Sequence, residues 1–469
     1  MSEIKFGTSG WRAIIADDFT LANVRRAVEG ISRYVVAHHG EGLPSLVMGR
    51  DPRFLGETAV QLAAQVASSH GIHCLVSEEA APTPAISVEI RRRHTDGGIN
   101  FTASHNPAEW NGIKYSTPDG APALPEVTRE IERLIREGGG ERPPGLSGQP
   151  GKIESIDLHP PYLADIRAKV DLEVIRKAGL KLAVDPFYGA ARGYTDRLLR
   201  EAGVSVVVIH DRRDVLFGGY PPEPSDERLG DLKQAMAESG AALGLSTDGD
   251  GDRFGILDRG GRFMQPNYIV GLLFDYLAET RGWKAGAGKS VATTNLVNAL
   301  AEHRGVPLYE TPVGFKYIGE LIKADKIVLG GEESAGLSIY GHVPEKDGIL
   351  ACLLAAEMVA RRGAALAAQL EELFRKVGGF YPERVNVRMS AEQKARFDAR
   401  LKQEEPGQFA GRRVKQAVRT DGLKLILDDG SWVLFRASGT EPVVRLYAEA
   451  RAAAELAPLL EESKKFVFG

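Results

Sequence analysis

The sequence predicts a protein of several α/β units followed by a smaller α+β unit. Its 469 residues exceed what one hydrophobic core usually organises, since domains cluster at roughly 100–200 residues. Strand-like and helix-like apolar segments alternate along most of the chain, which is typical of mainly parallel sheets covered by helices. After Gly378 and Gly379 this order changes to strands joined by a tight turn. Together these observations predict four units.

The first predicted unit spans residues 1–150. Apolar residues at helical spacing predict helices over 21–36 and 57–70. Short apolar runs predict strands over 46–48, 72–76 and 98–101. A stretch rich in Gly and Pro over 138–145 suits neither helix nor strand, so we interpret it as the linker that ends this unit.

The second and third predicted units span residues 151–258 and 259–375. In the second unit the run over 204–209, apolar except for Ser205, is typical of a strand buried on both faces. The other elements expected in these units are strands over 180–184, 290–294 and 326–329 and helices over 267–280 and 348–359. Because the element order repeats that of the first unit, the three units are expected to be similar.

The fourth predicted unit spans residues 376–469. An alternating strand is expected over 384–389, followed by a helix. Further on, Asp428-Asp429-Gly430 predicts a hairpin turn between two strands. This pattern indicates a smaller α+β unit.

Composition excludes several classes of function. Lys and Arg (59) nearly balance Asp and Glu (63), so the chain has no overall basic field for nucleic acid or an anionic membrane. Cys74 and Cys352 lie in apolar stretches, which favours buried, reduced thiols over a disulfide. No apolar run reaches the ~18 residues of a membrane helix, and the start of the chain lacks a signal region. We expect a cytoplasmic protein.

The sharpest motif is Asp248-Gly249-Asp250-Gly251-Asp252-Arg253, directly after an apolar strand. Three carboxylates at alternate positions, separated by glycines that allow a tight curl, can converge on one divalent cation. An EF-hand loop is excluded because its glycine position holds Arg253 and its final glutamate position holds Arg259. A polar turn without a metal would leave three like charges unpaired. The motif therefore predicts a Mg²⁺ site with positions open for a phosphate.

A second polar loop, Thr102-Ala103-Ser104-His105-Asn106-Pro107, also follows a strand. Ligands of open α/β sheets bind beyond the carboxyl ends of strands, which places this loop where a site is expected. On its own the loop is ordinary turn chemistry. A serine hydrolase is disfavoured because no Gly-x-Ser-x-Gly motif is present and His105 is the chain neighbour of Ser104.

Two further loops could bind parts of a phosphorylated ligand. Arg436-Ala437-Ser438-Gly439-Thr440-Glu441-Pro442, with Arg445 beyond it, offers the guanidinium and hydroxyl groups that suit a phosphate, although a solvated turn is equally compatible. Gly330-Gly331-Glu332-Glu333-Ser334-Ala335-Gly336 offers carboxylates and a hydroxyl for sugar hydroxyls, a weak signal by itself. The stretch 286–290 resembles a nucleotide-binding P-loop, but Trp283 stands at its first glycine position and no helix is predicted to follow.

Taken in order, these motifs resemble the α-D-phosphohexomutase superfamily of phosphoglucomutases and phosphomannomutases. The resemblance runs from Phe6-Gly7-Thr8-Ser9-Gly10-Trp11-Arg12 to Arg445. It implies three similar α/β domains with mixed sheets and a smaller C-terminal α+β domain around a central cleft. It also implies a phosphoserine loop, a metal loop, a sugar-binding loop and a phosphate-binding loop, one from each domain.

The resemblance implies a role for each matching residue. Ser104 would carry the phosphoryl group and would also be a ligand of Mg²⁺. Asp248, Asp250 and Asp252 would hold the ion against its phosphate. The catalytic centre would include Arg12, His105, Lys114 and Arg253, with Lys114 a candidate general acid/base. The sugar and its other phosphate would contact Lys316, Glu332, Ser334, Arg436, Ser438, Gly439, Thr440 and Arg445.

The implied activity interconverts hexose 1-phosphate and hexose 6-phosphate through a hexose 1,6-bisphosphate, which also acts as the activator. Mannose and glucosamine mutases of the superfamily carry a histidine after a serine-glycine pair, whereas this chain reads Ser334-Ala335-Gly336. Glucose is therefore the expected sugar, with phosphomannomutase or dual activity second and glucosamine phosphate third. The expected partners are hexose phosphates only, in a monomer or homodimer. A phosphatase or a silent sugar-phosphate sensor are rivals, but a sensor would be expected to lack Ser104 or a metal aspartate.

Overall fold

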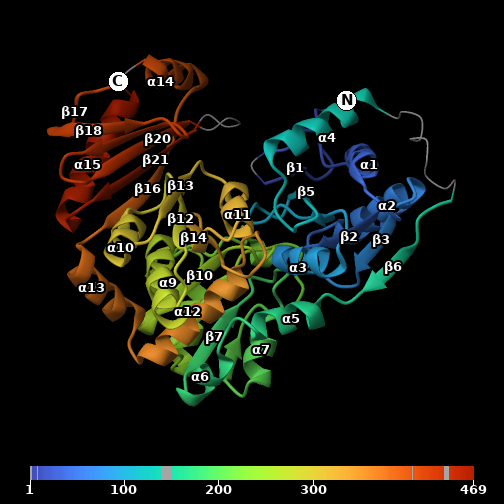
Figure 1. Cartoon of the computed structure of the whole chain (residues 1–469), viewed down its shortest axis with the longest axis horizontal. Helices are drawn as coiled ribbons and strands as arrows, with labels where there is room; N and C mark the ends of the chain where they lie inside the picture. Colours follow the sequence, from blue (N-terminus) through green and yellow to red (C-terminus); the bar gives the residue numbers. More distant parts are fainter. Residues whose placement is uncertain (1–2, 8, 139–148, 404, 438–442, 469) are drawn as a thin grey trace.

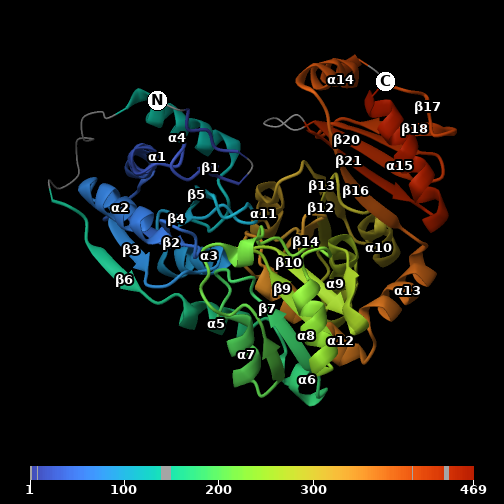
Figure 2. The same cartoon turned by 180° about the vertical axis from the view of Figure 1, so that it is seen from behind.

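The computed structural model describes residues 3–7, 9–138, 149–403, 405–437 and 443–468. These residues form four units that follow one another along the chain (Figure 1). The first and fourth units make two arms, and the second and third lie between and below them in both views (Figures 1 and 2). The predicted fold class is confirmed, since three units carry mixed sheets and the fourth carries an antiparallel sheet with helices.

The first unit has the sheet order β1-β5-β4-β2-β3-β6. Its strands are β1 (Trp11–Ile14), β2 (Ser45–Arg50), β3 (His73–Ser77), β4 (Gly98–Phe101), β5 (Trp110–Ser116) and β6 (Ile153–Ile156). Its helices are α1 (Leu21–His38), α2 (Gly56–Ser69), α3 (Thr83–Arg93) and α4 (Pro125–Glu137). Each helix and strand predicted here is present. Because β6 pairs with β3, this sheet continues past residue 150, and the predicted linker lies, apart from Gly138, outside the described residues.

The second unit has the sheet order β11-β10-β9-β7-β8. Its strands are β7 (Lys181–Asp185), β8 (Ser205–Val208), β9 (Leu243–Thr247), β10 (Phe254–Asp258) and β11 (Arg262–Met264). Its helices are α5 (His159–Arg167), α6 (Leu172–Lys177), α7 (Thr195–Glu201) and α8 (Gly230–Ser239). The expectation that the apolar run over 204–209 is buried on both faces is wrong. This strand, β8, lies at the edge of the sheet and is only half-buried, with Ser205 exposed.

The third unit has the sheet order β13-β12-β14-β15. Its strands are β12 (Gly286–Ser290), β13 (Leu308–Thr311), β14 (Ile327–Glu332) and β15 (Gly336–Ile339). Its helices are α9 (Pro266–Thr280), α10 (Leu296–Arg304), α11 (Phe315–Lys323), α12 (Gly348–Arg362) and α13 (Leu366–Val377). The strand predicted over 290–294 is wrong. The strand is instead β12, which covers the stretch over 286–290 that resembles a nucleotide-binding P-loop. Its glycines are required by close packing: a Cβ on Gly286 would lie 2.2 Å from the Pro307 carbonyl oxygen.

The fourth unit has the sheet order β16-β21-β20-β19-β18-β17. Its strands are β16 (Tyr381–Arg388), β17 (Gln408–Phe409), β18 (Arg412–Val418), β19 (Leu423–Leu427), β20 (Trp432–Ala437) and β21 (Val443–Ala450). Its helices are α14 (Ala391–Gln403) and α15 (Ala453–Phe468). The predicted hairpin turn joins β19 to β20, and its Gly430 has a φ of 86°, which glycine adopts without strain.

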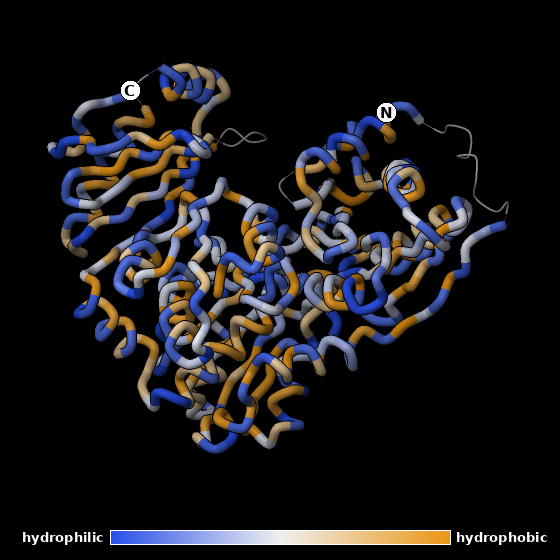
Figure 3. The backbone as a smooth tube through the Cα atoms, in the orientation of Figure 1, coloured by the Kyte–Doolittle hydropathy of each residue, from blue (hydrophilic) through white to orange (hydrophobic). Residues whose placement is uncertain are grey.

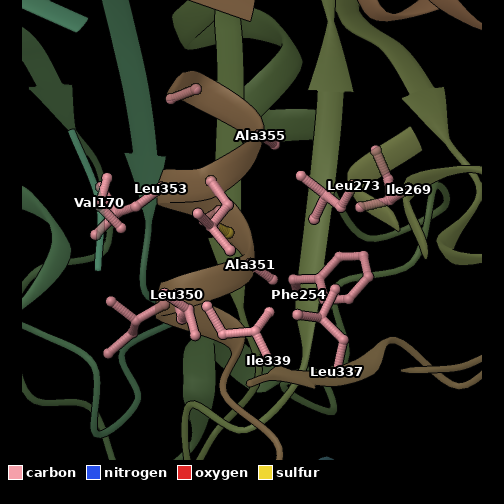
Figure 4. Close-up of a cluster of buried hydrophobic side chains, with 14 of the residues drawn as sticks. Val170, Phe254, Ile269, Leu273, Leu337, Ile339, Leu350, Ala351, Leu353 and Ala355 are labelled. Atoms are coloured by element: carbon pink, nitrogen blue, oxygen red, sulfur yellow. The ribbon is translucent and has the colours of Figure 1, made fainter. Parts of the chain in front are cut away.

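The largest core among the described residues is continuous through the first, second and third units and surrounds α12. Figure 4 shows Leu353 and Ala355 of this helix beside Leu273 of α9 and Val170 of the segment after α5. Hydrophobic residues are spread over short segments in every unit (Figure 3). Among the described residues no helix combines the length and hydropathy needed to span a membrane. Cys74 and Cys352 are both buried free thiols, as predicted.

Truncating a side chain under α12 should destabilise the protein. Leu353 is 0% exposed, so Leu353→Ala is expected to lower the free energy of unfolding by about 2–5 kcal/mol, through lost apolar burial and the cavity left behind. Urea titration would measure this change. Leu43→Ala is the control, because Leu43 is 72% exposed and its truncation should change stability by less than about 0.5 kcal/mol. Equal losses in the two variants would contradict the assigned core.

Candidate functional site

The site is centred where a loop of the first unit meets a loop of the second. Ser104 follows β4, and Asp248 follows β9. The Ser104 Oγ donates a hydrogen bond of 2.6 Å to Asp248 Oδ2, and both side chains are buried. Gly249 permits this approach, since a Cβ there would lie 2.6 Å from the Ser104 carbonyl oxygen. The two loops singled out in the sequence therefore share one site.

The three aspartates of the second loop form a buried carboxylate cluster. Asp248, Asp250 and Asp252 each offer an oxygen within 4.8 Å of the others. The Oδ1 atoms of Asp250 and Asp252 are buried and accept no hydrogen bond. Burial and the two neighbouring carboxylates raise the pKa of Asp248 well above its usual value. Convergent carboxylate oxygens with unused lone pairs fit the hard ligand set that Mg²⁺ takes.

Two lysines from different units face this cluster. The Lys114 ammonium, on β5, lies 2.5 Å from Asp250 Oδ2 and 2.7 Å from Asp252 Oδ2. The Lys346 ammonium, in the loop before α12, lies 2.6 Å from Asp252 Oδ2. Burial disfavours the charged form of Lys114, but Asp250 and Asp252 outweigh it and raise its pKa. Both lysines therefore carry positive charge in this arrangement.

The other residues predicted for the catalytic centre lie beside Ser104. His105 Nδ1 is 3.3 Å from Ser104 Oγ. Burial, together with the charges of Arg253 and Arg12, lowers the pKa of His105 well below its usual value, so this imidazole is neutral. Arg12, on β1, donates to Asn106 Oδ1 at 2.9 Å, which ties it to the same loop. The structure thus brings the predicted catalytic residues and the aspartates together.

The third unit approaches this centre from a different side. Lys316, at the start of α11, lines a cavity with Lys114 and Lys346. Glu332, at the end of β14, accepts a hydrogen bond of 2.8 Å from the Gly314 amide. Burial and the neighbouring Glu333 raise the pKa of Glu332 to about 7. Ser334 is half-buried in the turn that follows.

The fourth unit contributes two arginines on neighbouring strands. Arg436, on β20, pairs with Arg445, on β21, in the antiparallel register, so the two side chains lie on the same face of the sheet. The Arg436 Nε donates to Asp421 Oδ2 at 2.9 Å, and Asp421 also accepts from the Val313 amide of the third unit at 3.1 Å. Figure 1 shows the end of β20 facing the first unit across the space between the arms. Ser438, Gly439 and Thr440 lie outside the described residues.

Sequence reasoning missed several residues that contact the carboxylate cluster. Lys346 carries a signal in the sequence, because Glu345-Lys346-Asp347 places three charges directly before a strongly apolar helix. Thr83 and Asn100 carry none: the Asn100 amide donates to Thr83 Oγ1 at 2.9 Å, and that hydroxyl donates to Asp250 Oδ2 at 2.6 Å. These two hydrogen bonds allow residues of the first unit to orient the Asp250 carboxylate of the second unit.

The chain matches known family models along almost its whole length. Residues 3–141, 160–261 and 265–377 match the alpha/beta/alpha domains I, II and III of phosphoglucomutase/phosphomannomutase, respectively. Residues 385–465 match the C-terminal domain of the same family.

Individual relatives are similar over almost their whole length. A phosphoglucomutase/phosphomannomutase of Thermococcus kodakarensis is 30% identical over 97% of this chain and 96% of its own. A protein of Methanothermobacter thermautotrophicus assigned as a phosphoglucosamine mutase is 32% identical over 95% and 94% of the two chains. The crystal structure of a protein from Thermus thermophilus assigned as a phosphomannomutase covers 100% of both chains, with 32% identity and a TM-score of 0.85.

The raised pKa of Glu332 should make stability depend on pH. The unfolded carboxyl releases its proton near pH 4.5, but the folded one keeps it until about pH 7. The folded state binds more protons in this window, so it loses stability as pH rises through it, by roughly 3 kcal/mol for a shift of this size. Glu332→Gln should abolish this part of the pH dependence.

Urea titrations at several pH values from about 5 to about 8, spaced by about one pH unit, would compare the stability of wild type with that of this variant. Glu302→Gln, which changes an exposed carboxylate on α10, is the control and should keep the wild-type profile. Identical profiles for wild type and Glu332→Gln would show that Glu332 is ionised throughout.

Proposed function

Because the chain belongs to the phosphoglucomutase/phosphomannomutase family, we propose that it transfers a phosphoryl group between the 1- and 6-hydroxyls of a hexose through a phosphorylated Ser104. The observation that carries this proposal is the contact of 2.6 Å between Ser104 Oγ and the buried Asp248 carboxylate. Phosphoryl transfer depends on positioning and charge neutralisation. The site offers what this requires: a hydroxyl, a carboxylate cluster and several fixed cations.

The residues around Ser104 have distinct tasks in this proposal. Asp248, Asp250 and Asp252 would hold Mg²⁺, which when bound neutralises charge on the phosphoryl oxygens. Arg12, which donates to Asn106 of the Ser104 loop, and Arg253, which follows Asp252 in the chain, would supply fixed positive charges for the same oxygens. Neutral His105 can hold the proton of the Ser104 hydroxyl, since its Nδ1 lies 3.3 Å away. Charged Lys114 and Lys346 can donate a proton to the sugar oxygen that leaves when Ser104 takes back a phosphoryl group.

Recognition of the sugar falls to the third and fourth units. Glu332 and Ser334 would bind sugar hydroxyls, with Lys316 beside them. The Arg436 and Arg445 pair would hold the phosphate that is not being transferred, together with the loop of Ser438, Gly439 and Thr440. Transfer then runs from phosphorylated Ser104 to the free hydroxyl, and a hexose 1,6-bisphosphate primes the serine.

Glucose is the proposed sugar, with mannose second and glucosamine third. Gly336 stands where the mannose and glucosamine mutases compared above have a histidine. A Cβ at Gly336 would lie 2.3 Å from the Lys346 Cδ, so the lysine stem fills the space that a larger residue would need. We therefore propose that Lys346 takes over the role of that histidine, which supports a glucose-type site.

Loss of the Ser104 hydroxyl should abolish turnover. Ser104→Ala is expected to lower kcat by several orders of magnitude, because it removes the proposed carrier of the phosphoryl group. Mass spectrometry should find one phosphoryl group on wild type after incubation with glucose 1,6-bisphosphate, and none on the variant. Ser463→Ala, on α15 in the fourth unit, is the control and should behave like wild type. Normal turnover by Ser104→Ala would disprove the mechanism.

Sugar preference can be ranked by a coupled assay with the 1-phosphates of glucose, mannose and glucosamine, each with Mg²⁺ and its bisphosphate. The expected order of kcat/KM is glucose, mannose, glucosamine. Free phosphate is measured in parallel, because a phosphatase would release it whereas a mutase would yield the 6-phosphate. A higher kcat/KM for glucosamine than for glucose would contradict the role given to Gly336 and Lys346.

A further inference from the structure

One arginine outside the residues discussed so far is completely buried beside the Ser104 loop. Arg53 follows β2 in Asp51-Pro52-Arg53, and its side chain is 0% exposed. A buried guanidinium is costly unless its charge and its five N–H donors are all satisfied. Every donor of Arg53 has a partner, and four of the five partners are backbone carbonyl oxygens of one loop.

The Ser104 loop wraps around this guanidinium. One terminal nitrogen, Nη2, donates to the carbonyl oxygens of Ser104 and Asn106, both at 2.7 Å. The other, Nη1, donates to those of Pro107 at 2.7 Å and Trp110 at 3.0 Å. Between residues 104 and 110, the backbone therefore takes its shape from one rigid, planar group.

Asp51 holds the other side of the same loop. Its Oδ2 accepts from Arg53 Nε at 2.9 Å and from Thr102 Oγ1 at 2.7 Å. The Thr102 hydroxyl in turn accepts from the Ser104 amide at 2.8 Å. The amide and the carbonyl of Ser104 are thus both tied to the Asp51 and Arg53 pair.

Ser104 needs this support because its backbone conformation is unfavourable. Its φ is 53°, in the left-handed region that residues with a Cβ rarely adopt. Such a conformation is strained and persists only where the surroundings enforce it. Here it accompanies the hydrogen bond that directs the Ser104 Oγ to Asp248 in the second unit.

The second unit also covers the guanidinium. The Phe217 ring lies over Arg53, with its centroid 4.8 Å from Cζ, and Phe217 is itself buried. An aromatic face stabilises a desolvated cation and keeps water from competing for its hydrogen bonds. Arg53 is therefore clamped at the boundary of the first and second units that Ser104 and Asp248 also span.

We propose that Arg53, covered by Phe217, is a positioning residue that holds Ser104 in its strained conformation with its hydroxyl directed at Asp248. This inference rests on the proposed function of Ser104. Arg53 has no contact with the sugar-binding residues among its hydrogen bonds, so it governs the transfer step and not the binding of the sugar. Lysine cannot replace it, because three donors on one nitrogen cannot reach four carbonyl oxygens and Asp51.

The test compares Arg53→Lys with Arg281→Lys. Arg281 is a matched control, because it also joins two units, donating to the Lys169 carbonyl oxygen and to the buried Glu357, but lies away from the Ser104 loop. Arg53→Lys should lower kcat on the order of 100-fold, as a small misplacement of a reacting group does, while KM for the hexose 1-phosphate stays at the wild-type value. Arg281→Lys should lower the melting temperature and leave kcat unchanged.

Chemical rescue gives a second readout. Arg53→Ala should lose activity and recover part of it when guanidinium ion is added, since the ion can occupy the vacated position, whereas added ammonium should not help. Should Arg53→Lys fail to fold, Phe217→Leu replaces it as the test, with all Arg53 donors kept and a several-fold fall in kcat expected at constant KM.

The outcomes separate the two proposals. Wild type without mutase activity on any of the three sugars would refute the proposed function itself. Active wild type with a normal kcat in Arg53→Lys, or in Phe217→Leu if that variant is used, would refute the role of Arg53 alone. A fall in kcat with unchanged KM, absent from Arg281→Lys, would establish Arg53 as a positioning residue.

Discussion

Three carboxylates buried within 4.8 Å of one another set the main constraint on this molecule. Like charges removed from water repel strongly, and removing one carboxylate from water costs several kcal/mol unless cations or hydrogen bonds compensate. The compensation comes from more than one unit: Lys114 from the first and Lys346 from the third lie within 2.7 Å of these carboxylates. The two lysines reach the cluster only when the units are assembled, so assembly of the units and formation of the site are coupled.

The architecture meets this constraint by placing polar loops at the carboxyl ends of buried strands. The Ser104 loop follows β4, the aspartate loop follows β9, and Glu332 ends β14. Three similar sheets thus direct equivalent ends at a common region, whereas the antiparallel fourth sheet supplies Arg436 and Arg445 from strands side by side. Small residues make the approach possible: a Cβ on Gly249 would lie 2.6 Å from the Ser104 carbonyl oxygen, which leaves no room for a side chain.

Features that follow from a local residue pattern could be predicted from the sequence. Features that depend only on packing between distant segments could not. Asp248, Asp250 and Asp252 stand at alternate positions after an apolar strand, so their convergence was predictable. The strand β12 was not, because Gly286 and Gly288 carry no apolar pattern and are set by neighbours at Pro307 and Ile327. Thr83, Asn100 and Arg53 were missed for the same reason: their partners lie far away in the chain, and no spacing marks them.

The way the centre is held also constrains how the reaction can proceed. Ser104 is fixed through its amide, its carbonyl and its hydroxyl, and the guanidinium that shapes its loop has no donor left over. A serine held in this way cannot move to follow first one and then the other hydroxyl of a sugar. In the proposed reaction both hydroxyls are phosphorylated at this one position, so the sugar has to reverse its direction between the two transfers. The recognition groups of the third and fourth units therefore have to accept the sugar in both directions, which requires groups that read hydroxyls and phosphate common to the two orientations.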